Sequence, residues 1–340
     1  MAHRARALCG LWATALVASV FAAPGFGASR ANGIDLSRWN RVTSWTRVAA
    51  GGYRFVVAKA SDGASRSDFT YPSYRADASA VGLKLGAYHF ARPAGKNRVA
   101  AVANAVAQAD HFLAVAQPRA SDLLPVLDLE KIGGLTPPLL ISWTSAWLQE
   151  VSKRLHARPL VYTSPRFWQK ALSDTPAFAA SGYSLWLARW TTVPDPFVPA
   201  QNWAGLGWTF WQWTSCGHVG GIRGCVDLDR FNGPSLSSVL VRAAPTSVSP
   251  PTIVGFAQLD QTLTAARGGW QGTIPVRFAY AWERCDAEGA NCLAITGATG
   301  TTYTLGPPDV GSTIAVVVTA TNAIGSTSST SLPSPVIVAS

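Results

Sequence analysis

The stretch Leu124-Pro-Val-Leu-Asp-Leu-Glu130 joins an apolar β-strand to two carboxylates at its end. Side chains alternate between the two faces of a strand, so Asp128 and Glu130 share one face while Leu127 and Leu129 occupy the other. The two carboxyl groups lie about 6–7 Å apart along such a strand, and their repulsion favours protonation of one of them. The pattern indicates an acid beside a carboxylate, although a solvent-facing pair at a strand end has the same sequence.

Seven further runs of this apolar kind lie in the first two thirds of the chain, and the early ones alternate with helix-like segments. The strand-like runs are at 33–36, 54–60, 83–90, 123–130, 159–162, 184–189, 209–213 and 226–231. The helix-like segments are at 42–50, 74–81, 98–115 and 139–155. Strands that alternate with helices pair in parallel through right-handed crossovers. We therefore expect an α/β fold, a TIM-like barrel with helices between its first five strands only.

Two more acidic residues stand at strand ends of this expected barrel. Asp35 closes the first run, in Gly-Ile-Asp-Leu-Ser (33–37), and Asp227 lies in the last, in Val-Asp-Leu-Asp-Arg-Phe-Asn-Gly (226–233). The first and last strands of a closed barrel are neighbours, so both should join Asp128 and Glu130 at one mouth. Alone, Asp35 would also suit a helix cap and Asp227 a turn. Asp229 shares the face of Asp227, and spacing does not exclude it.

Aromatic residues gather at the same strand ends. They are Tyr88, Tyr162, Trp186, Trp190, Trp211 and Trp213. Sugars stack their apolar faces on such rings, whereas core packing explains aromatic residues equally well. Carboxyl groups and rings around one mouth favour hydrolysis of a glycosidic bond, in which a protonated carboxyl group releases the leaving oxygen and other carboxylates stabilise the cationic sugar.

The N-terminus has the features of a secretory signal peptide at 1–28. A basic start precedes sixteen apolar residues at 8–23 and small residues at 24–28, which predicts cleavage near Gly27 or Ala28. Four cysteines remain after cleavage, in the close pairs Cys216/Cys225 and Cys285/Cys292. In a secreted chain an even count predicts disulfides, and pairing of neighbours is favoured because each pair falls inside a different domain.

The length of 340 residues and a break in composition indicate two folded units. The break is the uncharged segment Pro-Thr-Ser-Val-Ser-Pro-Pro (245–251). We expect a barrel domain at 29–236, a Pro/Ser-rich linker at 237–252 and a second domain at 253–340. Runs of period two at 277–283 and 314–321 predict a small β-sandwich in the second domain.

Charge and residue types exclude several other classes. Residues 29–340 carry 26 basic and 18 acidic residues, a formal charge of +8. The basic residues are dispersed, without a run of three, which does not indicate nucleic-acid binding. The five histidines (3, 89, 111, 156 and 218) are scattered, so we expect no metal and no cofactor. His89 fits a buried structural group, and the paired cysteines argue against thiol catalysis.

Eight short motifs span residues 33–233. They are Gly-Ile-Asp-Leu-Ser (33–37), Phe-Val-Val-Ala-Lys-Ala (55–60), Gly-Ala-Tyr-His-Phe-Ala (86–91), Leu-Asp-Leu-Glu (127–130), Tyr-Thr-Ser (162–164), Leu-Trp-Leu-Ala-Arg-Trp (185–190), Trp-Gln-Trp (211–213) and Val-Asp-Leu-Asp-Arg-Phe-Asn-Gly (226–233). In these motifs and in their order, the segment resembles the family 25 glycoside hydrolases, secreted lysozymes of the Chalaropsis type. The family often has other residues at 38–41, where this chain has Arg-Trp-Asn-Arg, and Glu in place of Asp62. These departures affect subsite detail and leave the carboxylates intact.

The resemblance implies a (β/α)5β3 barrel that cuts the β-1,4 bond between N-acetylmuramic acid and N-acetylglucosamine in peptidoglycan. Glu130 would be the general acid, and Asp128, Asp35 and Asp227 would complete the acidic mouth. The candidate substrate-binding residues are Tyr88, Tyr162, Trp186, Arg189 and Trp211. Residues 253–340 resemble Ig-like accessory modules of secreted bacterial proteins, on Cys-Asp-Ala-Glu-Gly-Ala-Asn-Cys (285–292) and Ile-Ala-Val-Val-Val-Thr-Ala-Thr-Asn-Ala (314–323).

The expected partner is peptidoglycan with its anionic wall polymers, which suits the positive charge of the barrel. We expect a secreted monomer that binds neither nucleic acid nor, after signal cleavage, a membrane. The rival interpretation is a non-catalytic glycan-binding protein that retains the barrel. The presence of both Asp128 and Glu130 favours the enzyme.

Overall fold

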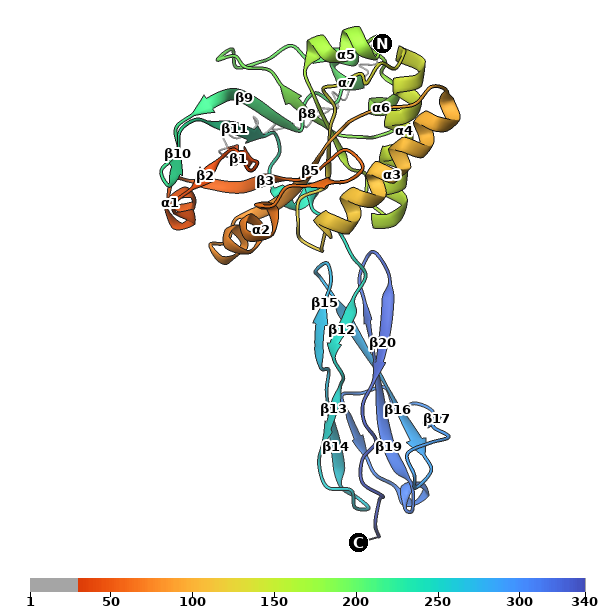
Figure 1. Ribbon diagram of the computed structural model, residues 1–340. Coiled ribbons are helices and arrows are strands. Elements are labelled where there is room, and N and C mark those ends of the chain that lie inside the picture. The colour runs from red at the N-terminus through yellow and green to blue at the C-terminus, as the bar shows by residue number, and fades with distance from the viewer. Residues whose placement is uncertain (1–29, 340) are drawn as a thin grey trace, which may run out of the picture.

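The computed structural model describes residues 30–339, so the predicted signal peptide lies outside the described residues. The chain forms two parts that differ in architecture (Figure 1). A rounded part of mixed helices and strands comes first, and an elongated part built of strands follows it.

Within the described residues, eight strands of the first part close into one sheet. They are β1 (Asn32–Leu36), β3 (Tyr53–Asp62), β5 (Lys84–Phe90), β6 (Val126–Asp128), β7 (Leu160–Thr163), β8 (Leu185–Ala188), β9 (Phe210–Gly217) and β11 (Val226–Phe231). Their order is β1-β11-β9-β8-β7-β6-β5-β3, and β1 also pairs with β3, which closes the ring. Only β11 runs antiparallel to both of its neighbours. The predicted α/β class and all eight predicted strand positions are confirmed.

Three short strands lie outside this ring. They are β2 (Arg41–Val42), β4 (Arg66–Ser67) and β10 (Ile222–Arg223). β2 and β10 pair with each other, and β4 extends the end of β3.

The helices cover the outside of the closed sheet (Figure 1). They are α1 (Trp45–Ala50), α2 (Tyr71–Ala80), α3 (Arg98–Ala116), α4 (Pro137–Leu155), α5 (Pro165–Ala171), α6 (Ala177–Ala180) and α7 (Pro199–Ala204). The two long helices begin with clear signals: the Asn97 side chain accepts a hydrogen bond from the backbone of Ala100 at 2.9 Å, and α4 begins at Pro137. The sequence predicts α1 to α4 but not α5 to α7, which are too short for a helical repeat to be recognised.

Helix α3 is long and apolar enough to span a membrane by length and composition alone. Its buried residues Ala101, Ala105 and Ala109 form one stripe, and Phe112 continues it. This stripe packs against α4 and the barrel, so α3 is a core helix.

Alternation along the strands separates two apolar clusters. In β3, Phe55 and Val57 belong to the cluster inside the barrel, while Val56 belongs to the cluster under the helices. β6 repeats the pattern with Val126 inside and Leu127 outside. The same alternation directs the next residue, Asp128, to the barrel interior at the end of the strand.

The second part consists of antiparallel strands in three small sheets. The strands are β12 (Thr246–Ser249), β13 (Thr252–Val254), β14 (Thr262–Ala266), β15 (Gly269–Gln271), β16 (Arg277–Cys285), β17 (Leu293–Ala294), β18 (Thr302–Thr304), β19 (Thr313–Thr321) and β20 (Ser326–Thr330). Trp282 of β16 is fully buried against Ile314, Val316 and Val318 of β19, the face that the period-two pattern predicts. Both expected disulfides, Cys216–Cys225 and Cys285–Cys292, are present.

Much of the stretch 237–252, expected as a linker, is paired with one part or the other. A 3-10 helix, η1 (Leu236–Val239), leads into it, and the Leu124 amide donates to the Val239 carbonyl at 2.8 Å. The Val241 amide donates to the Asp122 carbonyl at 2.7 Å, and β12 then pairs with β15. A Pro/Ser-rich composition does not distinguish a paired segment from a free one, and the buried Val239 and Val241 tie this stretch to the barrel.

Candidate active site

The four acidic residues that the sequence singles out border one cavity at the mouth of the barrel. This cavity, the acidic mouth, has a volume of about 240 Å³ and is bordered by Asp35, Asp128, Glu130 and Asp227. Strand register brings them together, since Asp35 pairs with Asp227 across β1 and β11. The other residues that line it are Ser37, Trp39, Lys59, Tyr88, Phe90, Tyr162, Trp186 and Gln212.

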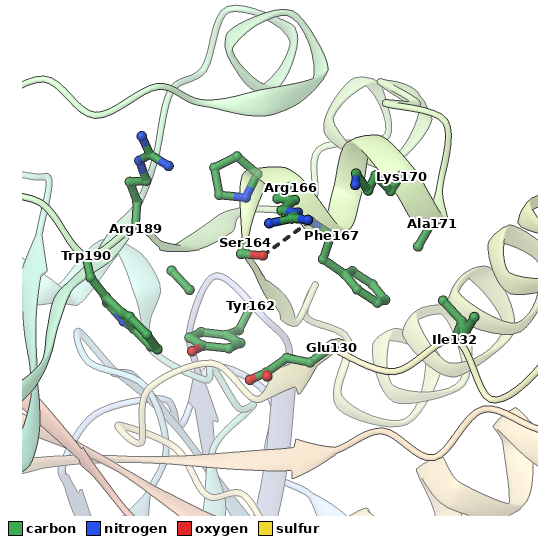
Figure 2. Close-up of a pocket in the computed structure, with 12 residues that line it drawn as sticks. Glu130, Ile132, Tyr162, Ser164, Arg166, Phe167, Lys170, Ala171, Arg189 and Trp190 are labelled. Carbon is green, nitrogen blue, oxygen red and sulfur yellow. Dashed lines mark hydrogen bonds between the residues drawn. The ribbon is translucent and has the colours of Figure 1, made fainter.

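The acids of the mouth differ in their access to solvent. Asp35 is 7% exposed and Asp128 is 6% exposed, whereas Glu130, two residues beyond the end of β6, is exposed at the rim. Figure 2 shows the Glu130 carboxyl group beside the ring of Tyr162, and both residues border the acidic mouth. Glu130 therefore faces the cavity and remains reachable from solvent.

Burial and mutual repulsion keep protons on this cluster. Burial and the charges of Asp229 and Asp227 raise the pKa of Asp35 well above its usual range. Burial and the charge of Glu130 raise the pKa of Asp128 in the same way. Burial also raises the pKa of Asp227, from 3.8 to about 6. The site thus binds protons at pH values where an isolated Asp is ionised.

Asp229, which the spacing could not separate from Asp227, lies below the cavity. It is 1% exposed, and it accepts a hydrogen bond from Nε1 of Trp186 at 2.8 Å. Its Oδ2 is buried with no partner among the described residues, and burial raises the pKa of this carboxyl group. Asp229 therefore acts on the mouth through its charge on Asp35 and does not line it.

Gln212 holds several residues of the mouth in place. Its Nε2 donates to Oδ2 of Asp35 at 2.8 Å, and its Oε1 accepts from the Tyr162 hydroxyl at 3.0 Å and from Nε1 of Trp190 at 2.9 Å. The sequence prediction missed Gln212. The signal was present in Trp-Gln-Trp (211–213), because alternation puts Gln212 on the face opposite the two tryptophans.

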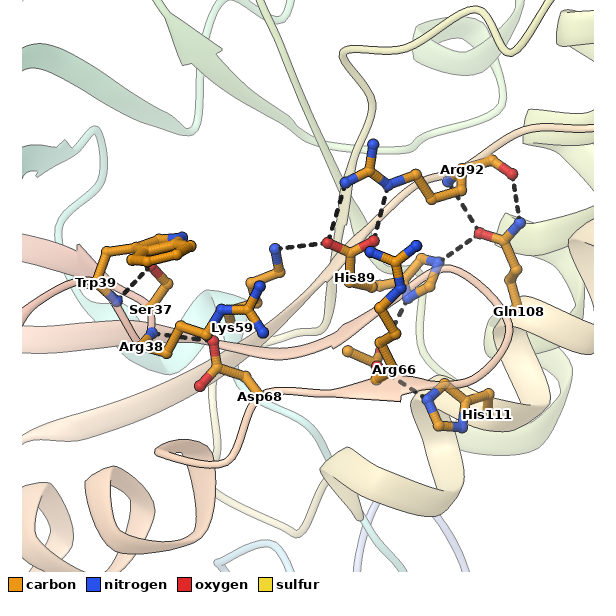
Figure 3. A network of polar contacts seen from close by, with 12 residues as sticks. Ser37, Arg38, Trp39, Lys59, Arg66, Asp68, His89, Arg92, Gln108 and His111 are labelled. Atoms are coloured by element: carbon orange, nitrogen blue, oxygen red, sulfur yellow. Dashed lines mark hydrogen bonds and ion pairs between the residues drawn. The ribbon is translucent and has the colours of Figure 1, made fainter.

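A second polar network contains Lys59, a basic residue that lines the acidic mouth (Figure 3). Nζ of Lys59 lies 3.0 Å from Oδ2 of Asp62, and Nε of Arg92 lies 2.8 Å from Oδ1 of Asp62. Burial would raise the pKa of Asp62, but hydrogen bonds from Arg92 and Lys59 lower it to about 2. Asp62 therefore fixes Lys59 at the edge of the mouth, where its charge favours ionisation of Asp128.

His89 lies beneath this network and is fully buried. Its ring nitrogens lie 2.8 Å from the hydroxyl of Ser61 and 3.0 Å from Oε1 of Gln108 (Figure 3), and its ring stacks on Trp147. Burial lowers the pKa of His89 to about 4. These contacts agree with the expected structural role.

Four of the five predicted substrate-binding residues border a cavity, and two of the five, both tryptophans, are too deeply buried to contact a sugar. Tyr88 and Tyr162 line the acidic mouth, and Arg189 lines the neighbouring cavity described below. Trp186 borders the mouth but is 2% exposed, so its ring has no free face for a sugar. The prediction for Trp211 is wrong: it is fully buried and packs on Trp208 outside the barrel.

Two exposed tryptophans are better candidates for stacking on a sugar than the buried Trp186 and Trp211. Trp39 is 80% exposed at the acidic mouth, and Trp190 is 64% exposed in the neighbouring cavity. The sequence suggested Trp190 among the strand-end aromatics but gave no signal for Trp39, which follows β1 in a turn. Both rings are free to stack on a sugar.

The neighbouring cavity, which we call the cationic pocket, shares Glu130 and Tyr162 with the acidic mouth. It has a volume of about 700 Å³. Its other lining residues are Ile132, Ser164, Pro165, Arg166, Phe167, Lys170, Ala171, Ala188, Arg189 and Trp190 (Figure 2). The site is thus two adjoining cavities of opposite charge with Glu130 between them.

The shifted carboxyl groups predict how stability depends on pH. The folded-state pKa of Asp227 is raised from 3.8 to about 6, so its stabilising contribution is complete below pH 4 and is lost as the pH rises through 6. Asp227→Asn should therefore flatten the fall in Tm between pH 4 and pH 7 by roughly 2–4 °C. The contribution of Asp62 to stability changes with pH in the opposite direction. It is present above about pH 4 and is lost as the pH falls through 2. Thermal unfolding of wild type, Asp227→Asn and Asp62→Asn from pH 2 to 7 checks this, and parallel Tm profiles for wild type and Asp227→Asn would contradict it.

A closed α/β barrel whose strand ends present four carboxyl groups beside aromatic rings has the arrangement of a glycoside hydrolase. Residues 34–222 match the model of the glycosyl hydrolases family 25. The chain belongs to this family, and the resemblance seen in the sequence is confirmed. The acidic residues Asp35, Asp128 and Glu130 lie within the matched range, and Asp227 lies just beyond it.

Individual relatives match about three fifths of the chain. Lysozyme M1 of Streptomyces globisporus is 32% identical over 214 residues, which are 60% of this chain and 69% of that protein. An N,O-diacetylmuramidase of Arthroderma benhamiae is 31% identical over 215 residues, 61% of this chain and 84% of that protein. The solved structure of the lysozyme from Streptomyces coelicolor is similar with a TM-score of 0.55 at 30% identity, and it covers 63% of this chain and 96% of that one.

Proposed function

We propose that this protein is a secreted lysozyme that hydrolyses the β-1,4 bond between N-acetylmuramic acid and N-acetylglucosamine in peptidoglycan. The observation that carries the proposal is the meeting of Asp35, Asp128, Glu130 and Asp227 at one cavity in a member of family 25. The relatives named lysozyme and N,O-diacetylmuramidase support the choice of bond.

Glu130 acts as the general acid in this proposal. It is the solvent-accessible acid of the mouth, and it borders both cavities, so a glycosidic oxygen lying across the rim would meet it. Burial and the nearby charge of Glu130 favour the protonated form of Asp128. The pair therefore stores a proton that Glu130 delivers to the leaving oxygen.

The remaining acids stabilise the positive charge that develops on the sugar. Asp35 is oriented by Gln212, and its neighbour Asp227 faces the same cavity. Negative charge held in a partly water-excluded cavity stabilises an oxocarbenium-like transition state more strongly than in bulk water. In an alternative mechanism, Asp128 and its neighbours assist the attack on the sugar by a nucleophile or by the acetamido group of the substrate. Tyr88 and Tyr162 border the sugar-binding surface.

The finer assignments of architecture belong to the same proposal. The pairing of β9 and β11 without an intervening helix supports a (β/α)5β3 barrel at 29–236, and the antiparallel sheets around Trp282 support an Ig-like accessory domain at 253–340. The two disulfides and the signal-like residues 1–28 support export to the cell wall or medium. The positive charge of the barrel suits a monomeric enzyme working on anionic walls.

Clearing of a peptidoglycan suspension tests the proposal. We expect the purified protein to reduce the turbidity of the suspension, with a rate that EDTA does not change because the residues in the mouth supply the acid and the stabilising charge. Binding to peptidoglycan without release of fragments would identify the non-catalytic glycan-binding protein instead. Loss of activity on chelation, restored by zinc, would identify a metal-dependent enzyme.

A further inference from the structure

The cationic pocket contains more charge than the proposed bond cleavage uses. Arg166 and Lys170 lie four residues apart on α5, and Arg189 follows β8 on the facing side. In Figure 2 the three side chains lie along one side of the pocket, with Glu130 and Tyr162 along the other. Glu130 is the one acidic residue among those that line this pocket.

Within residues 30–339 none of these three cations has an ion-pair or side-chain hydrogen-bond partner. The ion pairs of the barrel involve other basic residues, namely Lys59, Arg75, Arg92 and Arg154. Two like charges at positions i and i+4 of a helix destabilise it by a few tenths of a kcal/mol, so Arg166 and Lys170 carry a small cost in the free protein. An anionic ligand in the pocket would remove that cost.

The rest of the lining is apolar. Ile132 is 49% exposed and Trp190 is 64% exposed, and the ring of Phe167 lies between them along the pocket in Figure 2. Exposed apolar side chains next to unpaired cations suit a ligand with small aliphatic groups and carboxylates together.

We infer that the cationic pocket binds the peptide stem of the muramic sugar through the carboxylates of that stem. The inference rests on the proposed function. The lactyl group of N-acetylmuramic acid carries a short peptide that combines alanine methyl groups with free carboxylates. The amide bond to this peptide uses the lactyl carboxyl group, so the sugars of a strand that bears stems are neutral. A muramic sugar held in the acidic mouth places its peptide within reach of the pocket, because the two cavities meet at Glu130 and Tyr162. The arrangement separates the anionic substituent from the carboxylates that act on the sugar.

The experiment compares glycan strands with and without their peptides. The kcat/KM for strands that bear stems is divided by the kcat/KM for strands stripped by an amidase, which leaves one lactyl carboxylate in place of each peptide with its several carboxylates. We expect this ratio to fall about tenfold in the double variant Arg166→Gln/Lys170→Gln, because two charge-assisted contacts are lost. Arg189→Gln gives an independent variant on another element. Lys153→Gln is the matched control and should leave the ratio unchanged, because Lys153 is exposed in the last turn of α4 and has no ion pair in the described part of the chain.

Two further arms identify the ligand and separate this inference from the proposed function. Phosphodiester polymers on the wall are the other source of negative charge, and hydrofluoric acid removes them; we expect the ratio to survive this treatment. Calorimetric titration with the product disaccharide, with and without its tetrapeptide, reads binding without turnover. We expect tighter binding of the peptide form, weakened by salt in wild type and less so in the double variant.

Equal ratios in wild type and the double variant, or a ratio that disappears after hydrofluoric acid, would overturn the assignment to peptide carboxylates. Hydrolysis of neither kind of strand, with the binding difference retained, would reject the proposed function and leave the pocket assignment standing. Equal binding of the two disaccharides would reject the pocket assignment.

Discussion

Glu130→Gln is expected to reduce kcat on peptidoglycan by about 10³-fold and to leave binding of the polymer intact. Glutamine has nearly the shape of glutamate and retains its contacts, but it holds no proton that it can deliver to a leaving oxygen. Glu130 lies exposed at the rim, so the substitution leaves no buried charge unpaired and should not lower Tm. The measurement is the initial rate of muropeptide release beside a wall-sedimentation assay.

Glu288→Gln provides the control for Glu130→Gln. It makes the same chemical change at an exposed position of the second part of the chain, between β16 and β17, and should leave both rate and binding unchanged. Turnover in Glu130→Gln within about threefold of wild type would remove Glu130 from the acid role.

Asp128→Asn is expected to reduce activity and to increase stability at pH 7. Activity should fall by about 10²-fold, because Asp128 no longer holds a proton beside Glu130. Stability should rise because Asp128 is 6% exposed, its Oδ1 is buried and has no partner among residues 30–339, and burial disfavours the charged form of this carboxyl group. Its folded pKa is raised, so the folded state bears a penalty that grows as the pH rises above the unfolded value, and an amide does not bear that penalty.

Kinetics and thermal unfolding on the same preparation check the two effects of Asp128→Asn together. Asp77→Asn, on the exposed face of α2, is the control that should change neither quantity. A fall in Tm together with the loss of activity would indicate that Asp128 is structural, and the shared-proton account would then be wrong.

The sequence predicts the barrel strands well because each is an apolar run bounded by polar turn residues. It also predicts that Asp35, Asp128, Glu130 and Asp227 meet, because strand ends of a closed barrel gather by geometry alone. The short helices α5 to α7 escape prediction because four to seven residues contain too little of a helical repeat. The stretch 237–252 was expected to be a linker because composition alone does not show where strand pairing begins.

The parts of the site that escaped prediction depend on contacts between distant loops. The cationic pocket joins residues of α5 to residues after β6 and β8, and no local pattern links them. The prediction for Trp211 is wrong because a position near a strand end does not by itself direct an aromatic side chain to the mouth. Phe210 lies in the interior cluster and Gln212 faces the cavity, so Trp211 between them must point outward. The alternation along β9 therefore predicts both the outward position of Trp211 and the inward position of Gln212.

Identification of the sugar at the newly formed reducing end tests the central claim most directly. Peptidoglycan is digested to completion, the fragments are reduced with borohydride, and mass spectrometry assigns the reduced residue. Cleavage of the proposed bond predicts reduced N-acetylmuramic acid, still carrying its peptide, at every new end. Reduced N-acetylglucosamine would contradict the account, because the enzyme would then cut the other glycosidic bond of the strand.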